Sequence, residues 1–126
     1  MYTDIQIVAP SSARDGDVVN VTIKVTNLTA AALNIEVAGI LEPGDILFIG
    51  YETRLIEPGE TKSFSGSFIM PSYDVTIHGY SYFQDTLDNE AEAVVSLTTV
   101  APPVGCLPVV LLGLTILAAI IAIGVG

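Results

Sequence analysis

Apolar and polar side chains alternate with a period of two through most of residues 4–99, which points to strands and away from helices. The clearest run is Val18 to Asn27, where valine or isoleucine at every odd position to Val25 alternates with polar side chains. Successive side chains of a strand point to opposite faces, so this pattern indicates an antiparallel strand with one buried face. Similar runs predict six further strands, over Asp4–Val8, Leu33–Leu41, Ile46–Ile56, Thr61–Met70, Val75–Phe83 and Ala91–Thr99.

Turn residues separate these runs. Glu42-Pro43-Gly44-Asp45 and Glu57-Pro58-Gly59-Glu60 place Pro-Gly where a type II turn needs a fixed φ followed by a positive one, and Asp85 to Glu90 reads as a polar loop. About seven short strands without intervening helices predict an all-β, immunoglobulin-like antiparallel β-sandwich. A small barrel is the alternative. The predicted core consists of Ile5, Ile7, Val19, Val21, Ile23, Val25, Leu33, Ile35, Val37, Phe48, Leu55, Phe64, Phe68, Val75, Ile77, Phe83, Val95 and Leu97.

The amino-acid sequence of two segments is similar to that of a known family. The stretch from Gly16-Asp17 to Asn27, followed by Leu55 to Thr61, an aromatic strand and Met70-Pro71, resembles the CARDB-like and related immunoglobulin-like modules of bacterial and archaeal surface proteins. The resemblance covers roughly residues 4–99. It implies an extracellular or adhesion-type sandwich, and its motifs carry no catalytic residue that transfers to this chain.

The chain divides into a charged head and an uncharged tail. All four Lys and Arg and all fourteen Asp and Glu residues lie before position 93. We expect a head over residues 1–99, a Pro-rich linker over 100–106 and an apolar helix over 107–126. Twenty helical residues span about 30 Å, the thickness of the hydrocarbon core of a bilayer.

A helix that is apolar all round either crosses a membrane or fills the centre of an assembly, and both alternatives are open for residues 107–126. Ala118, Ala122 and Gly126 recur every four residues, and with Gly113 they are the positions at which helices of several copies can approach closely. The expected partners are therefore a membrane, other copies of this chain in a homo-oligomer, or both. No Lys or Arg follows Lys62, so charge gives no orientation across a membrane.

Charge and cysteine usage exclude several classes. Four basic against fourteen acidic residues give a formal net charge of −10, which disfavours nucleic-acid binding. The single cysteine, Cys106, makes neither an intramolecular disulfide nor a cysteine zinc site. His78 is the only histidine, and no nucleophile motif accompanies it, so we expect no enzyme, no cofactor and no small-molecule substrate.

Two kinds of candidate site remain in the head. Asp85, Asp88 and Glu90 crowd one predicted loop with the hard oxygen ligands that calcium prefers, although without an EF-hand register. Asn20 and Asn27 each begin an Asn-x-Thr sequon, the acceptor for glycosylation in a cell-surface setting.

Tyrosines form a third candidate. Tyr51, Tyr73, Tyr80 and Tyr82 either make an exposed aromatic stripe that contacts a glycan or a neighbouring copy, or fill one face of the sandwich. The second interpretation is preferred.

These features predict a non-enzymatic structural or surface protein, with an acidic immunoglobulin-like head displayed and assembled through a C-terminal apolar helix. It would be membrane-anchored at the cell surface or part of an extracellular filament or virion. One alternative is a virion or filament subunit whose apolar helices pack in a viral membrane or a filament core. Another is a calcium- or carbohydrate-binding adhesion module.

Overall fold

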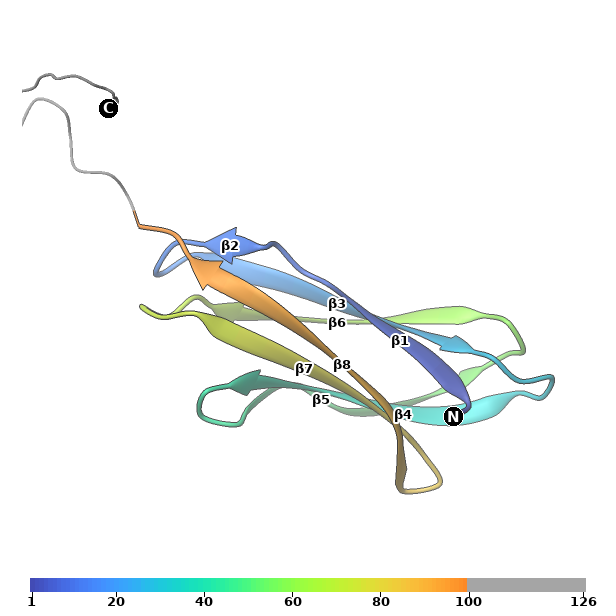
Figure 1. Ribbon diagram of the computed structural model, residues 1–126. Helices are drawn as coiled ribbons and strands as arrows, with labels where there is room; N and C mark the ends of the chain where they lie inside the picture. The colour runs from blue at the N-terminus through green and yellow to red at the C-terminus, as the bar shows by residue number, and fades with distance from the viewer. Residues whose placement is uncertain (100–126) are drawn as a thin grey trace, which may run out of the picture.

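The computed structural model describes residues 1–99, which form eight β-strands and no helix (Figure 1). The strands are β1 (Thr3–Val8), β2 (Ser12–Ala13), β3 (Val18–Asn27), β4 (Leu33–Glu42), β5 (Ile46–Ile56), β6 (Thr61–Ile69), β7 (Val75–Phe83) and β8 (Thr86–Leu97). None of the described residues forms a helix with the length and hydropathy that a membrane crossing requires. The predicted linker over 100–106, the helix over 107–126 and its packing residues Gly113, Ala118, Ala122 and Gly126 lie outside the described residues.

The strands make two sheets that face each other. One has the order β1-β3-β6 and the other the order β2-β8-β7-β4-β5. Every pairing is antiparallel except that of the two-residue strand β2 with β8. The prediction of an all-β sandwich is confirmed, and β2 is the additional strand. Two residues are too few to show alternation, so β2 had no signal in the sequence.

The core lies between the sheets and follows the predicted alternation on most strands. Ile23, Ile35, Phe64 and Ile77 are completely buried. The prediction for Leu55 was wrong, because this side chain is 49% exposed and its neighbour Ile56 is completely buried. The pairing of β5 with β4 shifts register twice near Gly39, so alternation along β5 is interrupted and cannot be extrapolated from one end to the other.

Two turns differ from their predicted form. The expected polar loop over 85–90 is wrong: Phe83 pairs directly with Thr86, and only Gln84 and Asp85 connect the strands. Both have positive φ, 52° and 62°, as a type I′ hairpin turn requires. This turn usually contains Asn-Gly, so Gln-Asp did not indicate it.

The two Pro-Gly turns have different geometries. At Glu57–Glu60, Gly59 has φ 75° and the N–H of Glu60 donates to the carbonyl oxygen of Glu57 at 3.0 Å, as a type II turn predicts. The other turn is not type II, because the Glu42–Pro43 peptide bond is cis and Asp45 has φ 51° after Gly44 at 104°.

The β7–β8 hairpin and the point where the chain leaves the head lie at opposite ends of the long axis of the sandwich. Strand β8 starts at this hairpin and ends at Leu97, at the same end of the sandwich as the β4–β5 and β6–β7 connections (Figure 1). Its twelve residues span about 40 Å at the rise of an extended strand. The hairpin therefore lies far from residue 99.

Candidate functional site

Four aromatic rings form a continuous row on the outer face of the five-stranded sheet. His78, Tyr80 and Tyr82 occupy alternate positions of β7, and Tyr51 of β5 continues the row. Ring centroids are 6.0 Å apart for His78 and Tyr80, 6.4 Å for Tyr80 and Tyr82, and 6.0 Å for Tyr82 and Tyr51. We call these four residues the aromatic row. Tyr73, in the connection between β6 and β7, is not part of it.

The aromatic row covers the middle of β4 from outside the sandwich. Ala38 pairs with Tyr80 and is completely buried, although it faces away from the core. Tyr80 and Tyr82 are half-buried, whereas Tyr51 is 56% exposed. The rings thus cover part of the outer face and leave aromatic surface exposed, and contact with a glycan or a neighbouring copy stays a prediction.

Other apolar side chains extend this face. Leu47 lies opposite Ile40, Leu87 opposite Tyr82, and Val94 opposite Thr76. The exposed fractions of these three are 48%, 49% and 55%. The outer face is therefore apolar at its centre, unlike a solvent-facing sheet with the usual polar alternation.

Carboxylates surround the apolar centre. Glu36 pairs with Tyr82, Glu90 with Tyr80 and Glu92 with His78, and Glu42 follows at the end of β4. The Oε2 of Glu92 lies 3.4 Å from the Nδ1 of His78. These four glutamates make the face strongly negative.

Ionisation of Tyr80 reflects this field. Its pKa is raised first by burial and then by nearby carboxylates, among them Glu90, Glu42 and Asp45. The pKa of Glu42 is also raised, first because its carboxyl shares a hydrogen bond with that of Asp45. A further negative charge on this outer face is thus unfavourable, and a positive charge is favourable.

The basic residues of the chain lie elsewhere. Arg54 of β5 points to the inner side, where its guanidinium lies 5.1 Å from the ring centroid of Phe64 and its Nε lies 2.9 Å from Glu52. Lys62, at the start of β6, forms an ion pair with Glu60. Lys24 belongs to β3 of the three-stranded sheet, and Arg14 to the turn before it. No Lys or Arg therefore neutralises the outer face.

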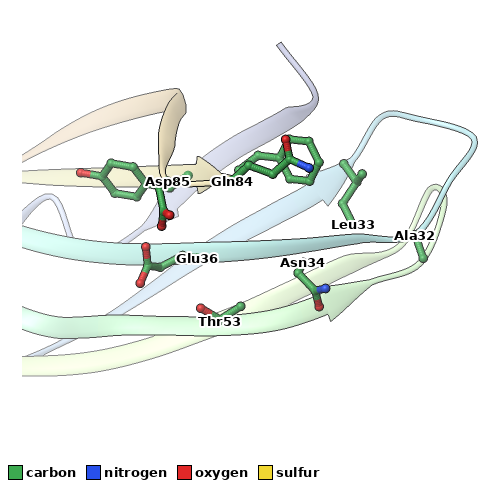
Figure 2. Close-up of a pocket in the computed structure, with 9 residues that line it drawn as sticks. Ala32, Leu33, Asn34, Glu36, Thr53, Gln84 and Asp85 are labelled. Atoms are coloured by element: carbon green, nitrogen blue, oxygen red, sulfur yellow. The ribbon is translucent and has the colours of Figure 1, made fainter.

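A groove of about 440 Å³ opens at the hairpin end of this face. Its polar lining comes from Asn34 and Glu36 of β4, Thr53 of β5, Tyr82 of β7, and Gln84 and Asp85 of the hairpin turn. Figure 2 shows the carboxylates of Glu36 and Asp85 directed toward one another, above Thr53. The groove thus combines two carboxylates with two side-chain amides, two aromatic rings and the Thr53 hydroxyl.

Asp88, a predicted calcium ligand, has a different environment. Its carboxylate accepts hydrogen bonds from the backbone N–H groups of Tyr2 and Thr3, at 2.8 and 2.9 Å, and from the Thr3 hydroxyl. Asn89 donates to the carbonyl oxygen of Thr3 at 2.9 Å, and the Thr3 and Ser81 hydroxyls are 2.9 Å apart. These contacts hold the start of β1 against the five-stranded sheet.

The structure does not bring the three predicted calcium ligands together. Asp85 lines the groove, Glu90 pairs with Tyr80, and Asp88 contacts β1. Across residues 1–99, no three His, Cys, Asp or Glu side chains form a group that could hold a metal ion.

Asp88 makes the stability of the head depend on pH. Burial alone would raise the pKa of its carboxyl, but hydrogen bonds from Thr3 and Tyr2 outweigh burial and lower the pKa below the usual 3.8. The carboxylate therefore adds stability above about pH 4, and this is lost as the pH falls. Asp88→Asn should lower the free energy of unfolding by about 1–2 kcal/mol at neutral pH and flatten its decrease between about pH 5 and pH 3.

Denaturant titrations over that pH range measure both effects. Asp15→Asn, in the exposed β2–β3 turn, is the control and should change the free energy of unfolding by less than about 0.5 kcal/mol. Parallel pH curves for wild type and Asp88→Asn would contradict the assignment.

The two sequon asparagines occupy opposite faces of β3. Asn20 is exposed. Asn27 is completely buried, and its Nδ2 donates to the carbonyl oxygens of Ala31 and Ile56 at 2.7 and 2.9 Å. In the folded head this amide nitrogen is not accessible to a glycan, whereas glycosylation of Asn20 stays a prediction.

Comparison with known proteins supports the fold. The sequence matches no protein family model and no curated protein. Among solved structures, the CARDB domain of the PF1109 protein from Pyrococcus furiosus aligns with a TM-score of 0.65 and 17% identity, over 76% of this chain and 87% of that one. Its solution structure aligns with the same score at 18% identity, over 76% and 94%. The FixG-related protein from Vibrio parahaemolyticus aligns with a TM-score of 0.55 and 15% identity, over 79% and 99%.

At such identities the likeness concerns the fold alone. The crystallised PF1109 domain is in complex with di-metal ions, which is a property of that domain. The described residues have the immunoglobulin-like β-sandwich fold of CARDB domains, and the resemblance seen in the sequence is confirmed at the level of fold.

Proposed function

From a head with the CARDB-like immunoglobulin-like fold, we propose that this protein is a non-enzymatic structural or surface protein whose acidic head is displayed by the apolar segment 107–126. The division of charge along the chain carries the proposal. Every charged side chain belongs to the head, and the segment has none. Such a segment is stable only in lipid or against other apolar helices.

The shape of the head suits display. The chain leaves β8 after Leu97, at the end of the sandwich opposite the β7–β8 hairpin (Figure 1), and Asp85 of this hairpin lines the groove. Anchoring through residues 107–126 would therefore place the groove at the far end of the head, with the aromatic row along its side.

The same segment is the proposed element of assembly. The small residues Gly113, Ala118, Ala122 and Gly126 allow close helix approach, while heads with an overall excess of carboxylates repel one another. A homo-oligomer held by its apolar segments fits a cell-surface membrane protein. It also fits a subunit of an extracellular filament or virion.

The contacts of His78 support a non-enzymatic role. The ring stacks on Tyr80 at an interplanar angle of 9°, and its Nδ1 faces Glu92. Within the described residues these contacts orient the only histidine toward the outer face and give it no nucleophile to activate.

Deleting residues 104–126 tests the proposal. The shortened chain should be a soluble monomer, because its remaining surface is acidic, whereas the full chain should require detergent or sediment as an assembly of many copies. Analytical ultracentrifugation of both, with and without detergent, measures this. A second variant, Ala118→Leu with Ala122→Leu, keeps the segment apolar and uncharged and should lower only the oligomeric state.

A truncated head that assembles like the full chain would overturn the role of the apolar segment. Detergent separates the two settings: it should disperse a membrane protein into small oligomers, whereas a filament or shell should keep its many copies.

A further inference from the structure

We propose that the outer face of the five-stranded sheet is a docking face for a basic polypeptide segment, whose arginine or lysine side chain enters the groove between Glu36 and Asp85. The inference goes beyond the proposed function and does not depend on how residues 107–126 are accommodated. It assigns a partner of defined chemistry to the aromatic row and the groove.

The two outer faces of this sandwich differ in a way that folding does not require. On the three-stranded sheet, the middle of β6 presents a row of serines, Ser63, Ser65 and Ser67, as expected for a face in water, and the exposed apolar pair Val18 and Ile69 lies at one end of it. The five-stranded sheet instead presents the aromatic row, with leucine and valine beside it. An exposed apolar face with a polar rim is typical of an interaction surface.

Charge complementarity identifies the partner as basic. Glu36, Glu42, Glu90 and Glu92 lie on the strands of this face, and the four basic residues of the chain point elsewhere. A second copy docking through the same face would bring these carboxylates against each other, which costs free energy. A cation instead gains from the carboxylates and from the faces of the tyrosine rings.

The groove has the composition of a site for one cationic side chain. Its volume of about 440 Å³ exceeds the need of a bare ion and leaves space for an aliphatic stem. Glu36 and Asp85 would accept hydrogen bonds from the guanidinium or ammonium group. Tyr82 would lie against it, and the Asn34 amide and Thr53 hydroxyl would satisfy further donors.

The edge of the sheet favours a polypeptide over a sugar. Strand β5 is an edge strand, paired only with β4 within residues 1–99. Its last part, Glu52 to Ile56, pairs without register shifts and includes Thr53 of the groove. An extended segment that adds to this edge would place alternate side chains over the outer face, next to the groove.

The test uses the full chain, in whatever detergent or assembly it purifies, and a nine-residue peptide of alternating arginine and serine. Binding is measured by calorimetry at a salt concentration near 0.15 M, where diffuse electrostatic attraction is screened beyond about 8 Å. A peptide with citrulline in place of arginine has nearly the same shape without the charge. We expect it to bind at least tenfold more weakly.

Matched variants separate the groove from net charge. Glu36→Gln with Asp85→Asn removes two carboxylates from the groove and should weaken arginine-peptide binding at least tenfold. Asp4→Asn with Asp15→Asn removes two exposed carboxylates from the three-stranded sheet and the β2–β3 turn, and should change binding less than twofold. Thr53→Arg supplies a cation from within the chain and should abolish binding while leaving the thermal unfolding transition in place.

Three results would overturn the proposal. The first is an equal loss of binding in the two double variants, which would mean attraction by net charge alone. The second is equal affinity for the citrulline peptide. The third is a neutral oligosaccharide such as cellohexaose that shifts the tyrosine ring resonances in NMR spectra while the arginine peptide does not.

Discussion

Replacing Asn27 by alanine should lower the free energy of unfolding of the head by about 3 kcal/mol or more. The side chain is completely buried at the end of β3 and makes four hydrogen bonds. Its Nδ2 donates to the carbonyl oxygens of Ala31 and Ile56, and its Oδ1 accepts from the backbone N–H and the hydroxyl of Thr29. Alanine removes all four bonds and leaves the buried carbonyl oxygen of Ile56 and the part-buried N–H of Thr29 without these partners, each of which costs about 1–3 kcal/mol.

The loss reaches both sheets, because Asn27 belongs to the three-stranded sheet and Ile56 ends the edge strand of the other. Asn20→Ala is a matched control on the same strand. Its side chain is exposed, so stability should change by no more than about 0.5 kcal/mol. Urea titrations followed by far-UV circular dichroism measure both variants, and equal changes would refute the structural role of Asn27.

Alternation alone predicted the sandwich and much of its detail. The bounds of β3, β5 and β7 are those expected from the sequence, because each run has a clear period of two and flanking turn residues. The same alternation also indicates that Asn27 is buried. It follows Val19, Val21, Ile23 and Val25 at the odd, buried positions, whereas Asn20 falls on the exposed ones. Two identical sequons thus have opposite environments for a reason already visible in the pattern.

The candidate face was predictable only within one strand. Tyr80 and Tyr82 are two residues apart, and their shared face follows from the period of a strand. Tyr51 joins them because β5 lies beside β4 and β4 beside β7, an order that no local pattern contains. The groove depends in addition on the two-residue turn at Gln84 and Asp85, which brings a carboxylate of the turn toward Glu36.

The acidic residues show the same limit. Composition placed Asp85, Asp88 and Glu90 together, and along the chain they are close. In the fold their side chains lie in three different places, because β8 extends through this segment. Asp88, for example, contacts the start of β1, more than eighty residues away in the sequence. A cluster in sequence becomes a cluster in space only when the backbone between its members turns.

Replacing Gly66 by alanine should lower the free energy of unfolding by about 2–3 kcal/mol. Gly66 occupies an inward position of β6, between Phe64 and Phe68. A Cβ built there would lie 2.5 Å from Cγ1 of Ile49, 3.1 Å from the carbonyl oxygen of Phe48 and 3.2 Å from its Cδ2. The bulged part of β5 presses against β6 at this point, where only a residue without a side chain leaves enough space.

Neither neighbour of Gly66 moves cheaply. Ile49 is 4% exposed in the core, and the Phe48 ring packs edge-on against Phe68 with centroids 5.7 Å apart. Because one of the contacts is to backbone, relief requires displacement of β5 itself. Gly50→Ala is the control: a Cβ there meets nothing within 4 Å, so stability should stay the same or rise by up to about 1 kcal/mol through the unfolded state. If Gly66→Ala were as stable as Gly50→Ala in the same urea titration, the close approach of β5 and β6 would not be what keeps glycine at position 66.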